Sequence, residues 1–404
     1  MNIKSNDIEY LGVNKEKILK AYPVFDEEKL KEYLHYIVER QEVLKKRQQG
    51  KNYPWTDDEI IKNNSFTNNH RFNDRYSRYV LNNIINDNKT SLSDRIYKSL
   101  LSRIYNCEGF CELVNISNPD FWNEEVVKDN IKKLENAEVK DGQIYTKAYR
   151  IIQPKVCYKE IYPNNHYKAH PLLYINDLRK KYGETIADLF KSFNARRCYE
   201  WIHNNVRGAG PFIAYQMFCD ISYFKEIPFS DRLFVVSGPG CTRGFSYLYK
   251  DWDGLSAEEL LWWHRNHLEE ELRKAYGFGY DKLFDNEPIS NRYFDLQECE
   301  NSGCEFSKYI QLLEGRQKKI RRYREENIKP IILTTAEIEQ NMFMESEYLL
   351  RNSQYKNLKV EQVKSEDKWQ ITDTKNRVRF KDIPTNVYET IKEITKINNE
   401  SEEI

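Results

Sequence analysis

The pattern in this chain that best suits a binding or catalytic site is a pair of glycines, Gly208 and Gly210, with an aspartate 21 residues after the second glycine. Gly208 and Gly210 precede an apolar run with helical spacing, so the sequence predicts a helix that starts at Pro211. Such a start exposes backbone N–H groups, which can bind an anion such as a phosphate. Asp231 then supplies a carboxylate that can stabilise developing positive charge. The alternative is an ordinary helix start with Asp231 as a simple N-cap.

A second stretch, Phe66 to Ile85, combines an apolar stripe with many polar side chains. The stripe predicts a helix that faces the core. Asn68, Arg71 and Asp74 lie between the apolar positions, and such groups can read the edge of an extruded base. The alternative is a solvated helix face with weak Arg–Asp pairs.

Further stretches carry groups that suit contacts with DNA phosphates. Gly238-Pro239-Gly240 is predicted to form a turn that leads to Arg243. Between 295 and 324, Glu300, Glu305 and Lys308 recur at a spacing that can present one polar face, and a basic run from Arg316 to Arg324 follows. A basic helix end can contribute a salt-dependent term to DNA affinity; the alternative is a solvated helix.

The composition limits the class of protein. The chain has 404 residues with 63 basic and 63 acidic side chains, so DNA binding must come from local basic patches rather than from net charge. The start of the chain is polar and no apolar run approaches a membrane-spanning length, which predicts a soluble, cytoplasmic protein with no membrane partner. The eight cysteines do not form a disulfide framework, and their spacing does not favour a metal site. No metal and no cofactor are therefore expected.

Changes in composition and hydrophobic pattern along the chain predict three domains. Residues 1–55 are expected to be an N-terminal helical extension, and residues 56–328 a helical core. Lys329-Pro330 marks a boundary, after which 329–404 reads as a small α+β module. Strand-like segments in that module run from Leu358 to Val363, Lys368 to Thr372 and Val378 to Phe380.

Four motifs in one order resemble a known family. They are FTNNHRFNDRYSR from Phe66, GAGPFIAYQMFCD from Gly208, SDRLFVVSGPGCTRG from Ser230 and CENSGCEFSKY from Cys299. Together they resemble the α-glutamyl/putrescinyl thymine pyrophosphorylases and related DNA base-hypermodification proteins. The spacing of the glycines and Asp231 is also similar to that of the helix-hairpin-helix DNA glycosylases. The resemblance implies a mainly α fold with a helix-hairpin-helix, DNA glycosylase-like core.

The resemblance also implies roles for individual residues. Catalytic roles fall to Asp231, Asp220 and Asp74, and the base pocket to Asn68, Asn69, Arg71, Gln216 and Tyr215. The resemblance and the local positive charge together predict contacts with DNA for Arg207, Gly208, Gly210, Gly238, Gly240, Arg243, Lys308, Arg321 and Arg322. Glycosylases that also cut the strand carry a lysine just after the hairpin glycines, where Pro211 and Phe212 stand here. This difference argues against a Schiff-base lyase at that position.

The preferred expectation is a monofunctional DNA glycosylase that flips out and excises a modified pyrimidine from double-stranded DNA in anti-phage defence. The first alternative is a DNA-modifying transferase that displaces pyrophosphate from activated 5-hydroxymethyluracil with an amine or amino acid. The second alternative is a non-catalytic reader of modified bases. The sequence by itself does not separate excision from transfer.

Overall fold

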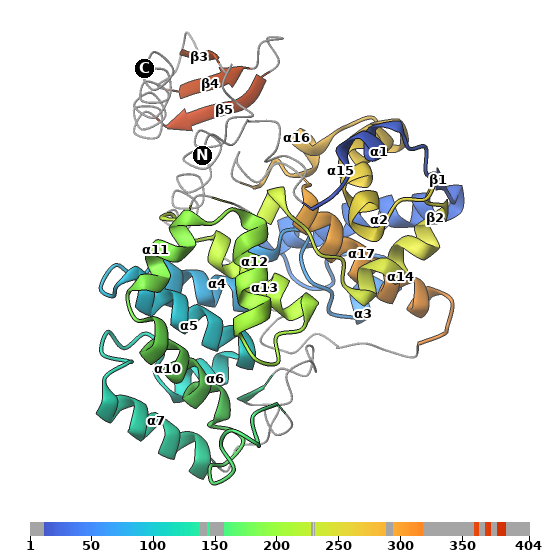
Figure 1. The fold of residues 1–404 in the computed structure, drawn as a ribbon. Coiled ribbons are helices and arrows are strands. Elements are labelled where there is room, and N and C mark those ends of the chain that lie inside the picture. Colours follow the sequence, from blue (N-terminus) through green and yellow to red (C-terminus); the bar gives the residue numbers. More distant parts are fainter. Residues whose placement is uncertain are drawn as a thin grey trace. The chain divides into compact units, whose positions relative to one another are not determined.

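The computed structural model describes residues 12–137, 144–145, 157–227, 229, 231–287 and 294–317, together with three strands at 359–362, 368–372 and 378–384. Helices dominate these residues, which confirms the predicted mainly α fold (Figure 1). Arg321 and Arg322, predicted to bind DNA, lie outside the described residues. Within the described ranges, no helix has the length and apolar character needed to cross a membrane.

The chain divides into two compact units. The first combines Met1–Arg71 with Arg232–Ile404, and the second is Phe72–Asp231. The first unit is therefore assembled from two separate stretches of sequence. The three-domain division of the chain at 55 and 328 stays a prediction.

The first unit is built mainly of helices from both stretches. It contains α1 (Lys15–Lys20), α2 (Glu27–Gln48), α3 (Glu59–Asn63), α14 (Pro239–Leu248), α15 (Ala257–Tyr276), α16 (Tyr280–Leu283) and α17 (Leu296–Leu313). Two short strands, β1 (Val24–Phe25) and β2 (Tyr249–Asp251), pair antiparallel and join the stretches. Asp26 caps α2 by accepting hydrogen bonds from the N–H groups of Glu28 and Lys29.

Glycines allow α14 and α17 to pack in close contact. A Cβ atom on Gly244 would overlap the carbonyl group of Gly303, and one on Gly240 would overlap the Sγ of Cys304. Only glycine permits this approach of the two helices. The turn predicted at Gly238-Pro239-Gly240 is wrong: Gly238 is the N-cap of α14 and Pro239 its first residue, a position where the missing N–H of proline costs nothing.

The second unit surrounds α5 (Leu92–Tyr105), whose residues are almost all buried. The other helical elements are α4 (Arg75–Val80), the π-helical η2 (Leu81–Ile85), α6 (Glu108–Leu113), α7 (Glu124–Asn136), α10 (His170–Tyr182), α11 (Thr185–Ser192), α12 (Ala195–Asn205) and α13 (Pro211–Ser222). Two 3₁₀ turns, η1 (Arg71–Asn73) and η3 (Asp231–Leu233), lie at the junctions between the units.

Helices α12 and α13 form a helical hairpin through Val206–Gly210. The predicted helix start is confirmed, with Gly210 as the N-cap and Pro211 as the first residue. Gly208 has φ +83°, which a residue with a Cβ rarely adopts. That this hairpin is a DNA-binding helix-hairpin-helix core stays a prediction.

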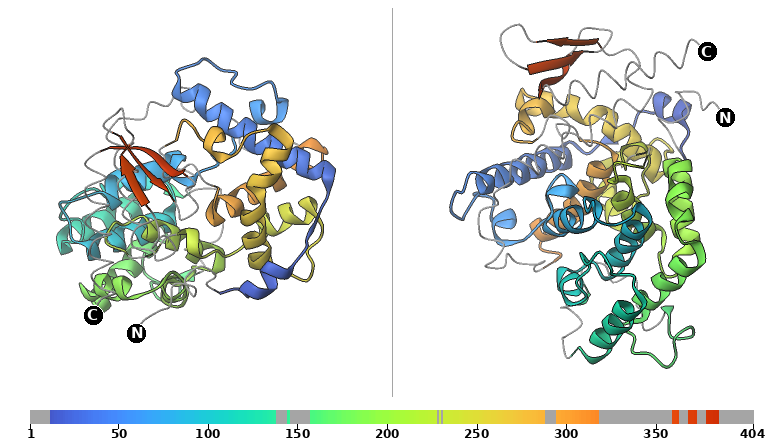
Figure 2. Two further views of the ribbon diagram at one scale, coloured as in Figure 1. Left: turned by 90° about the horizontal axis from the view of Figure 1, so that it is seen from above. Right: turned by 90° about the vertical axis from the view of Figure 1, so that its left-hand side faces the viewer.

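The three strands predicted near the C-terminus are confirmed. They are β3 (Lys359–Gln362), β4 (Lys368–Thr372) and β5 (Val378–Pro384). The strands pair antiparallel in the order β3-β4-β5, and Figure 2 draws them in dark red.

Candidate functional site

The structure distributes the predicted site residues over both units. The first unit holds Asn68, Asn69, Arg71, Gly238, Gly240, Arg243 and Lys308. The second unit holds Asp74, Arg207, Gly208, Gly210, Tyr215, Gln216, Asp220 and Asp231. Within the first unit, the loop before Arg71, the start of α14 and helix α17 meet in one polar cluster.

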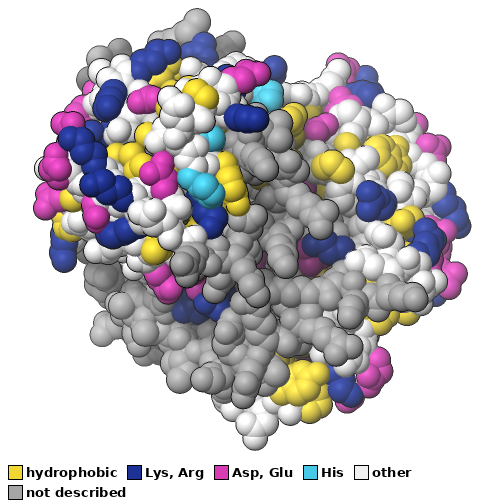
Figure 3. All heavy atoms as spheres, turned by 90° about the horizontal axis from the view of Figure 1, so that it is seen from below, with side chains coloured by type: hydrophobic (Ala, Val, Ile, Leu, Met, Phe, Trp, Pro, Cys, Tyr) yellow, Lys and Arg dark blue, Asp and Glu magenta, His cyan; other side chains and the backbone are white. Residues whose placement is uncertain are grey.

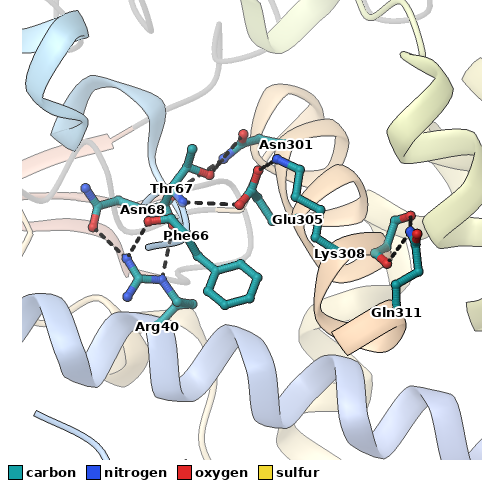
Figure 4. A network of polar contacts seen from close by, with 9 residues as sticks. Arg40, Phe66, Thr67, Asn68, Asn301, Glu305, Lys308 and Gln311 are labelled. Carbon is teal, nitrogen blue, oxygen red and sulfur yellow. Dashed lines mark hydrogen bonds and ion pairs between the residues drawn. The ribbon is translucent and has the colours of Figure 1, made fainter. Parts of the chain in front are cut away.

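Arg40, a buried residue of α2, holds the loop Phe66–Asn68 from one side. Its Nε donates to the carbonyl of Thr67 at 3.1 Å, and its Nη2 donates to the carbonyl of Phe66 at 3.3 Å. The same Nη2 donates to Oδ1 of Asn68 at 3.2 Å, as Figure 4 shows. A guanidinium group with several fixed donors is suited to fastening a loop through its carbonyl groups.

Helix α17 holds the same loop from the other side. Glu305 accepts a hydrogen bond from the backbone N–H of Thr67 at 3.3 Å and forms a short ion pair with Lys308. Asn301 donates through Nδ2 to the carbonyl of Asn68 at 3.0 Å and to Oγ1 of Thr67 at 3.2 Å. Side chains therefore satisfy the three carbonyls of the loop and the N–H of Thr67 (Figure 4).

These contacts explain why the helix predicted over Phe66–Ile85 is wrong in its first part. Residues 66–70 are not helical, a 3₁₀ turn covers Arg71–Asn73, and the α-helix starts only at Arg75. Helical hydrogen bonds are unnecessary in the loop because Arg40, Asn301 and Glu305 supply its partners.

Glu300 is the residue of this polar cluster that is best suited to proton transfer. It is 2% exposed, and its Oε1 accepts from the N–H of Gly238, at the start of α14, at 3.1 Å. Burial raises the pKa of its carboxyl group to about 7, although the Gly238 hydrogen bond and the charges of Lys308 and Arg71 favour ionisation. At neutral pH this group can therefore accept or give a proton.

The cysteines near Glu300 do not supply a nucleophile. Burial raises the pKa of the Cys304 thiol to about 12 and that of Cys241 well above its usual range. A thiol with a raised pKa stays protonated at neutral pH and reacts slowly. Among the described residues, no group of three or more His, Cys, Asp or Glu side chains is placed to hold a metal ion.

Asn69 points into the first unit. Its Nδ2 donates to the carbonyl of Ile37 at 2.9 Å and to Oε1 of Gln41 at 3.3 Å, and the residue is 3% exposed. These contacts tie the loop to α2. The base-pocket role expected for Asn69 stays a prediction.

Asp220 has a different environment in the second unit. Its carboxylate forms a bidentate pair with Arg103, with two N–O distances of 2.6 Å, and both side chains are buried. The Arg103 guanidinium also lies 5.2 Å from the centre of the Tyr76 ring. The geometry pairs the Asp220 carboxyl group with a cation in the interior of the unit, while its expected catalytic role stays a prediction.

The backbone just before the hairpin glycines of the second unit is held by tyrosines. Tyr174 donates to the carbonyl of Asn205 at 2.6 Å and accepts from the N–H of Arg207 at 3.1 Å. Tyr158 donates to the carbonyl of Arg207 at 2.6 Å. A Cβ atom on Gly210 would meet nothing within 4 Å, so packing does not require a glycine there.

The structure also shows which residues the sequence analysis missed. Arg40 and Asn301 carried no motif, although both help to fix the loop. Arg40 lies three residues after Ile37 and four before Leu44, both buried, so its position on the apolar face of α2 was the available signal. On the described part of the face drawn in Figure 3, Lys and Arg side chains are interspersed with Asp and Glu.

Comparison with known proteins identifies the family. The family described as "5-hmdU DNA kinase, helical domain" matches residues 27–319. The chain belongs to this family. A 5-hmdU DNA kinase of Bacillus phage SP10 is 22% identical over 292 residues, which cover 69% of this chain. The chain spans only 44% of the length of that relative. No solved structure matches.

These findings correct the expected function. Both names describe a DNA kinase, which is a transferase, so excision of the base by a monofunctional glycosylase is wrong. The broader expectation of a phage-type DNA base-modification family is confirmed. The spacing of Gly210 and Asp231 is similar to that of base-excising enzymes, and it therefore suggested excision. Such a spacing does not determine which bond breaks.

Proposed function

We propose that this chain is a DNA-modifying transferase that acts at the 5-hydroxymethyl group of uracil in DNA. The observation that carries the proposal is the family match over 27–319, which includes the loop before Arg71, α14 and α17. The reacting group would be the oxygen-bearing carbon or the hydroxyl outside the ring, and the glycosidic bond would stay intact.

The polar cluster of the first unit contains groups that suit such a transfer. In a transfer at a hydroxymethyl group the nucleophile loses a proton. Glu300, whose pKa is about 7, can accept such a proton at neutral pH. The transfer also concentrates negative charge on phosphate oxygens, which cations stabilise. Lys308 and Arg71 interact electrostatically with Glu300 and are placed in the same cluster.

We favour displacement of a pyrophosphate that is already attached to the hydroxymethyl group, with an amine or amino acid as the nucleophile. The phosphate-binding sequence Gly-x-x-x-x-Gly-Lys-Ser/Thr does not occur in the 404 residues. Phosphorylation of the hydroxyl, the activity that the name of the relative states, is a different reaction at the same group, because there the hydroxyl oxygen attacks phosphorus, whereas in the displacement the amine attacks the methylene carbon and pyrophosphate leaves.

The test uses the full chain and duplexes that carry thymine, 5-hydroxymethyluracil or its pyrophosphorylated form. Each duplex is incubated with ATP and Mg²⁺, or with putrescine or glutamate, and the nucleosides are analysed by mass spectrometry. We expect a new nucleoside from the pyrophosphorylated duplex with an amine and none from thymine. Glu300→Gln should slow its formation at least tenfold, whereas Glu270→Gln, at an exposed glutamate of α15, should not.

A second candidate is a base-recognition module that works with a separate catalytic chain. It is favoured by the match to a helical domain and by the 44% coverage of the relative. Selective binding of modified duplexes without any new nucleoside would support this candidate over the transferase.

A further inference from the structure

We propose that Arg243 of α14 and Lys308 of α17 form a phosphate subsite beside the Cys304 side chain, and that this subsite holds the pyrophosphate that the transfer releases. The proposal rests on the proposed function, because that reaction supplies the ligand. It assigns two cations from different helices to one leaving group, and it makes Glu305 the residue that positions Lys308.

The crossing of α14 and α17 brings the two cations to one place. A Cβ atom on Gly240 would overlap the Sγ of Cys304, so the two helices are in direct contact at these residues. Arg243 follows Gly240 by three residues and Lys308 follows Cys304 by four, and such spacings place side chains on one face of a helix. Burial raises the pKa of the Cys304 thiol, and the positive charges of Lys308 and Arg243 act in the opposite direction. Both cations are therefore close enough to Cys304 to act on one anion bound beside it.

The subsite is open to solvent, so a ligand can reach it. Arg243 is an exposed residue, and its guanidinium group forms no hydrogen bond or ion pair with the described part of the chain. The Lys308 side chain is 41% exposed. Cys304 is only partly buried. The three side chains therefore lie at the surface of the first unit rather than in its core.

Glu305 fixes the position of the Lys308 ammonium group. The Glu305 side chain is 5% exposed, and one of its oxygens pairs with Lys308, as Figure 4 shows. Its second oxygen accepts from the N–H of Thr67 at 3.3 Å, which holds the carboxylate in place. An ammonium group has three N–H donors, so Lys308 can pair with Glu305 and also donate to a phosphate oxygen. A lysine that is already held in place loses less freedom when the phosphate binds.

The chemistry of the displacement explains the use of two cations. As the amine nitrogen bonds to the methylene carbon, the carbon–oxygen bond breaks and its electron pair leaves on the pyrophosphate. The proton of the amine passes to Glu300. Negative charge grows on the phosphate oxygens during this step, and cations placed beside them stabilise it. The guanidinium group of Arg243 can bind two phosphate oxygens at once, while Lys308 acts as a point charge.

Isothermal titration calorimetry of the full chain with inorganic pyrophosphate, in the absence of DNA, tests the subsite. The wild type should bind a single pyrophosphate. Arg243→Gln and Lys308→Gln should each weaken binding roughly 10-fold, because each removes a charge-assisted contact. Lys308→Arg keeps the charge and should retain most of the affinity. Lys274→Gln is the matched control, since Lys274 also pairs with a glutamate three residues earlier on a helix, and it should leave the affinity unchanged.

Cysteine labelling shows where the pyrophosphate binds. The ligand should slow the reaction of Cys304 with N-ethylmaleimide because it covers the thiol. Cys107 and Cys157 are also partly buried and should react at unchanged rates. Peptide mass spectrometry measures the three sites separately. Unchanged labelling of Cys304 at saturating pyrophosphate would overturn the location.

Two further results would overturn the subsite. In the first, the wild type does not bind pyrophosphate, or both glutamine variants bind it as the wild type does while circular dichroism melts show that they are folded. In the second, each glutamine variant leaves pyrophosphate binding intact but weakens binding of an unmodified duplex and lowers its salt slope by about one, as expected for contacts with the DNA backbone. A new nucleoside formed despite either result leaves the proposed function standing. Pyrophosphate binding at Cys304 without any new nucleoside supports the subsite and removes the function.

Discussion

Two buried carboxyl groups in this protein have opposite electrostatic environments. Asp220 in the second unit is paired with Arg103 by two contacts of 2.6 Å. Glu300 in the first unit accepts one hydrogen bond, from the N–H of Gly238, and burial raises its pKa to about 7. A buried carboxylate with a matched cation keeps its charge, whereas one with a neutral donor can exchange a proton near neutral pH. The comparison explains why we assign proton transfer to Glu300.

The largest expected effect comes from removing the cation of the matched pair. Arg103→Met leaves the Asp220 carboxylate buried without its bidentate partner, which should cost about 3–5 kcal/mol of unfolding free energy. Urea denaturation at pH 7 measures this loss. The double variant Arg103→Met/Asp220→Leu should recover much of it, since neither charge of this pair is then buried. A loss below about 1 kcal/mol in the single variant would contradict the structural importance of the pair.

The next effect tests the unmatched carboxylate. The Glu300 pKa is raised from 4.5 to about 7 on folding, so ionisation of this group disfavours the folded state. The cost is absent below about pH 4, grows as the pH rises between the two pKa values and is complete above about pH 7. Glu300→Gln should therefore gain stability relative to wild type, from near zero at pH 4 to at most about 3 kcal/mol at pH 8. Urea titrations across this range measure the difference; a gain that does not change with pH would show that Glu300 titrates normally.

A third prediction concerns the glycine contact that places Glu300 beside α14. Gly244→Ala would force a methyl group against the carbonyl of Gly303, so it should cost about 1–3 kcal/mol and separate α14 from α17. Gly210→Ala is a matched control, because its φ is −61° and its Cβ would meet nothing within 4 Å. Thermal melts of both variants make the comparison. Equal stability of the two variants would contradict the close helix contact.

The smallest expected effect lies at a partly exposed pair in the first unit, His35 and Asp58. The hydrogen bond that His35 Nε2 donates to Oδ2 of Asp58 at 3.0 Å raises the pKa of His35 on folding above 6.5. The stabilisation is complete below pH 6.5 and is lost as the pH rises through the raised pKa. Because His35 is 42% exposed, His35→Gln should cost only a few tenths of a kcal/mol at pH 5.5 and nothing at pH 8.5. Paired urea titrations at the two pH values check the sign.

Sequence patterns predicted the elements whose hydrogen bonds are local. The helix start at Pro211 and the strands β3 to β5 followed from spacing and turn residues, and the structure confirms them. The loop Phe66–Asn68 was missed because its partners are distant in sequence. Asn301 lies 233 residues from Asn68, and Arg40 lies 28 residues from it. No local pattern around Asn68 contains these contacts.

The function could be predicted only in part for a related reason. The four motifs together indicated a protein that acts on modified bases in DNA, and the family match agrees at that level. The choice between excision and transfer depends on which bond breaks. The spacing of Asp231 from the glycines does not determine that bond, and the expectation of excision was wrong.

Analysis of the nucleosides in pyrophosphorylated 5-hydroxymethyluracil DNA after incubation with the full chain and an amine tests the central claim most directly. The account predicts a new nucleoside that carries the amine on the 5-methylene group, with the sugar still attached and with a strong dependence on Glu300. An unaltered nucleoside with every donor, from a folded wild type that binds the duplex, would contradict the transferase.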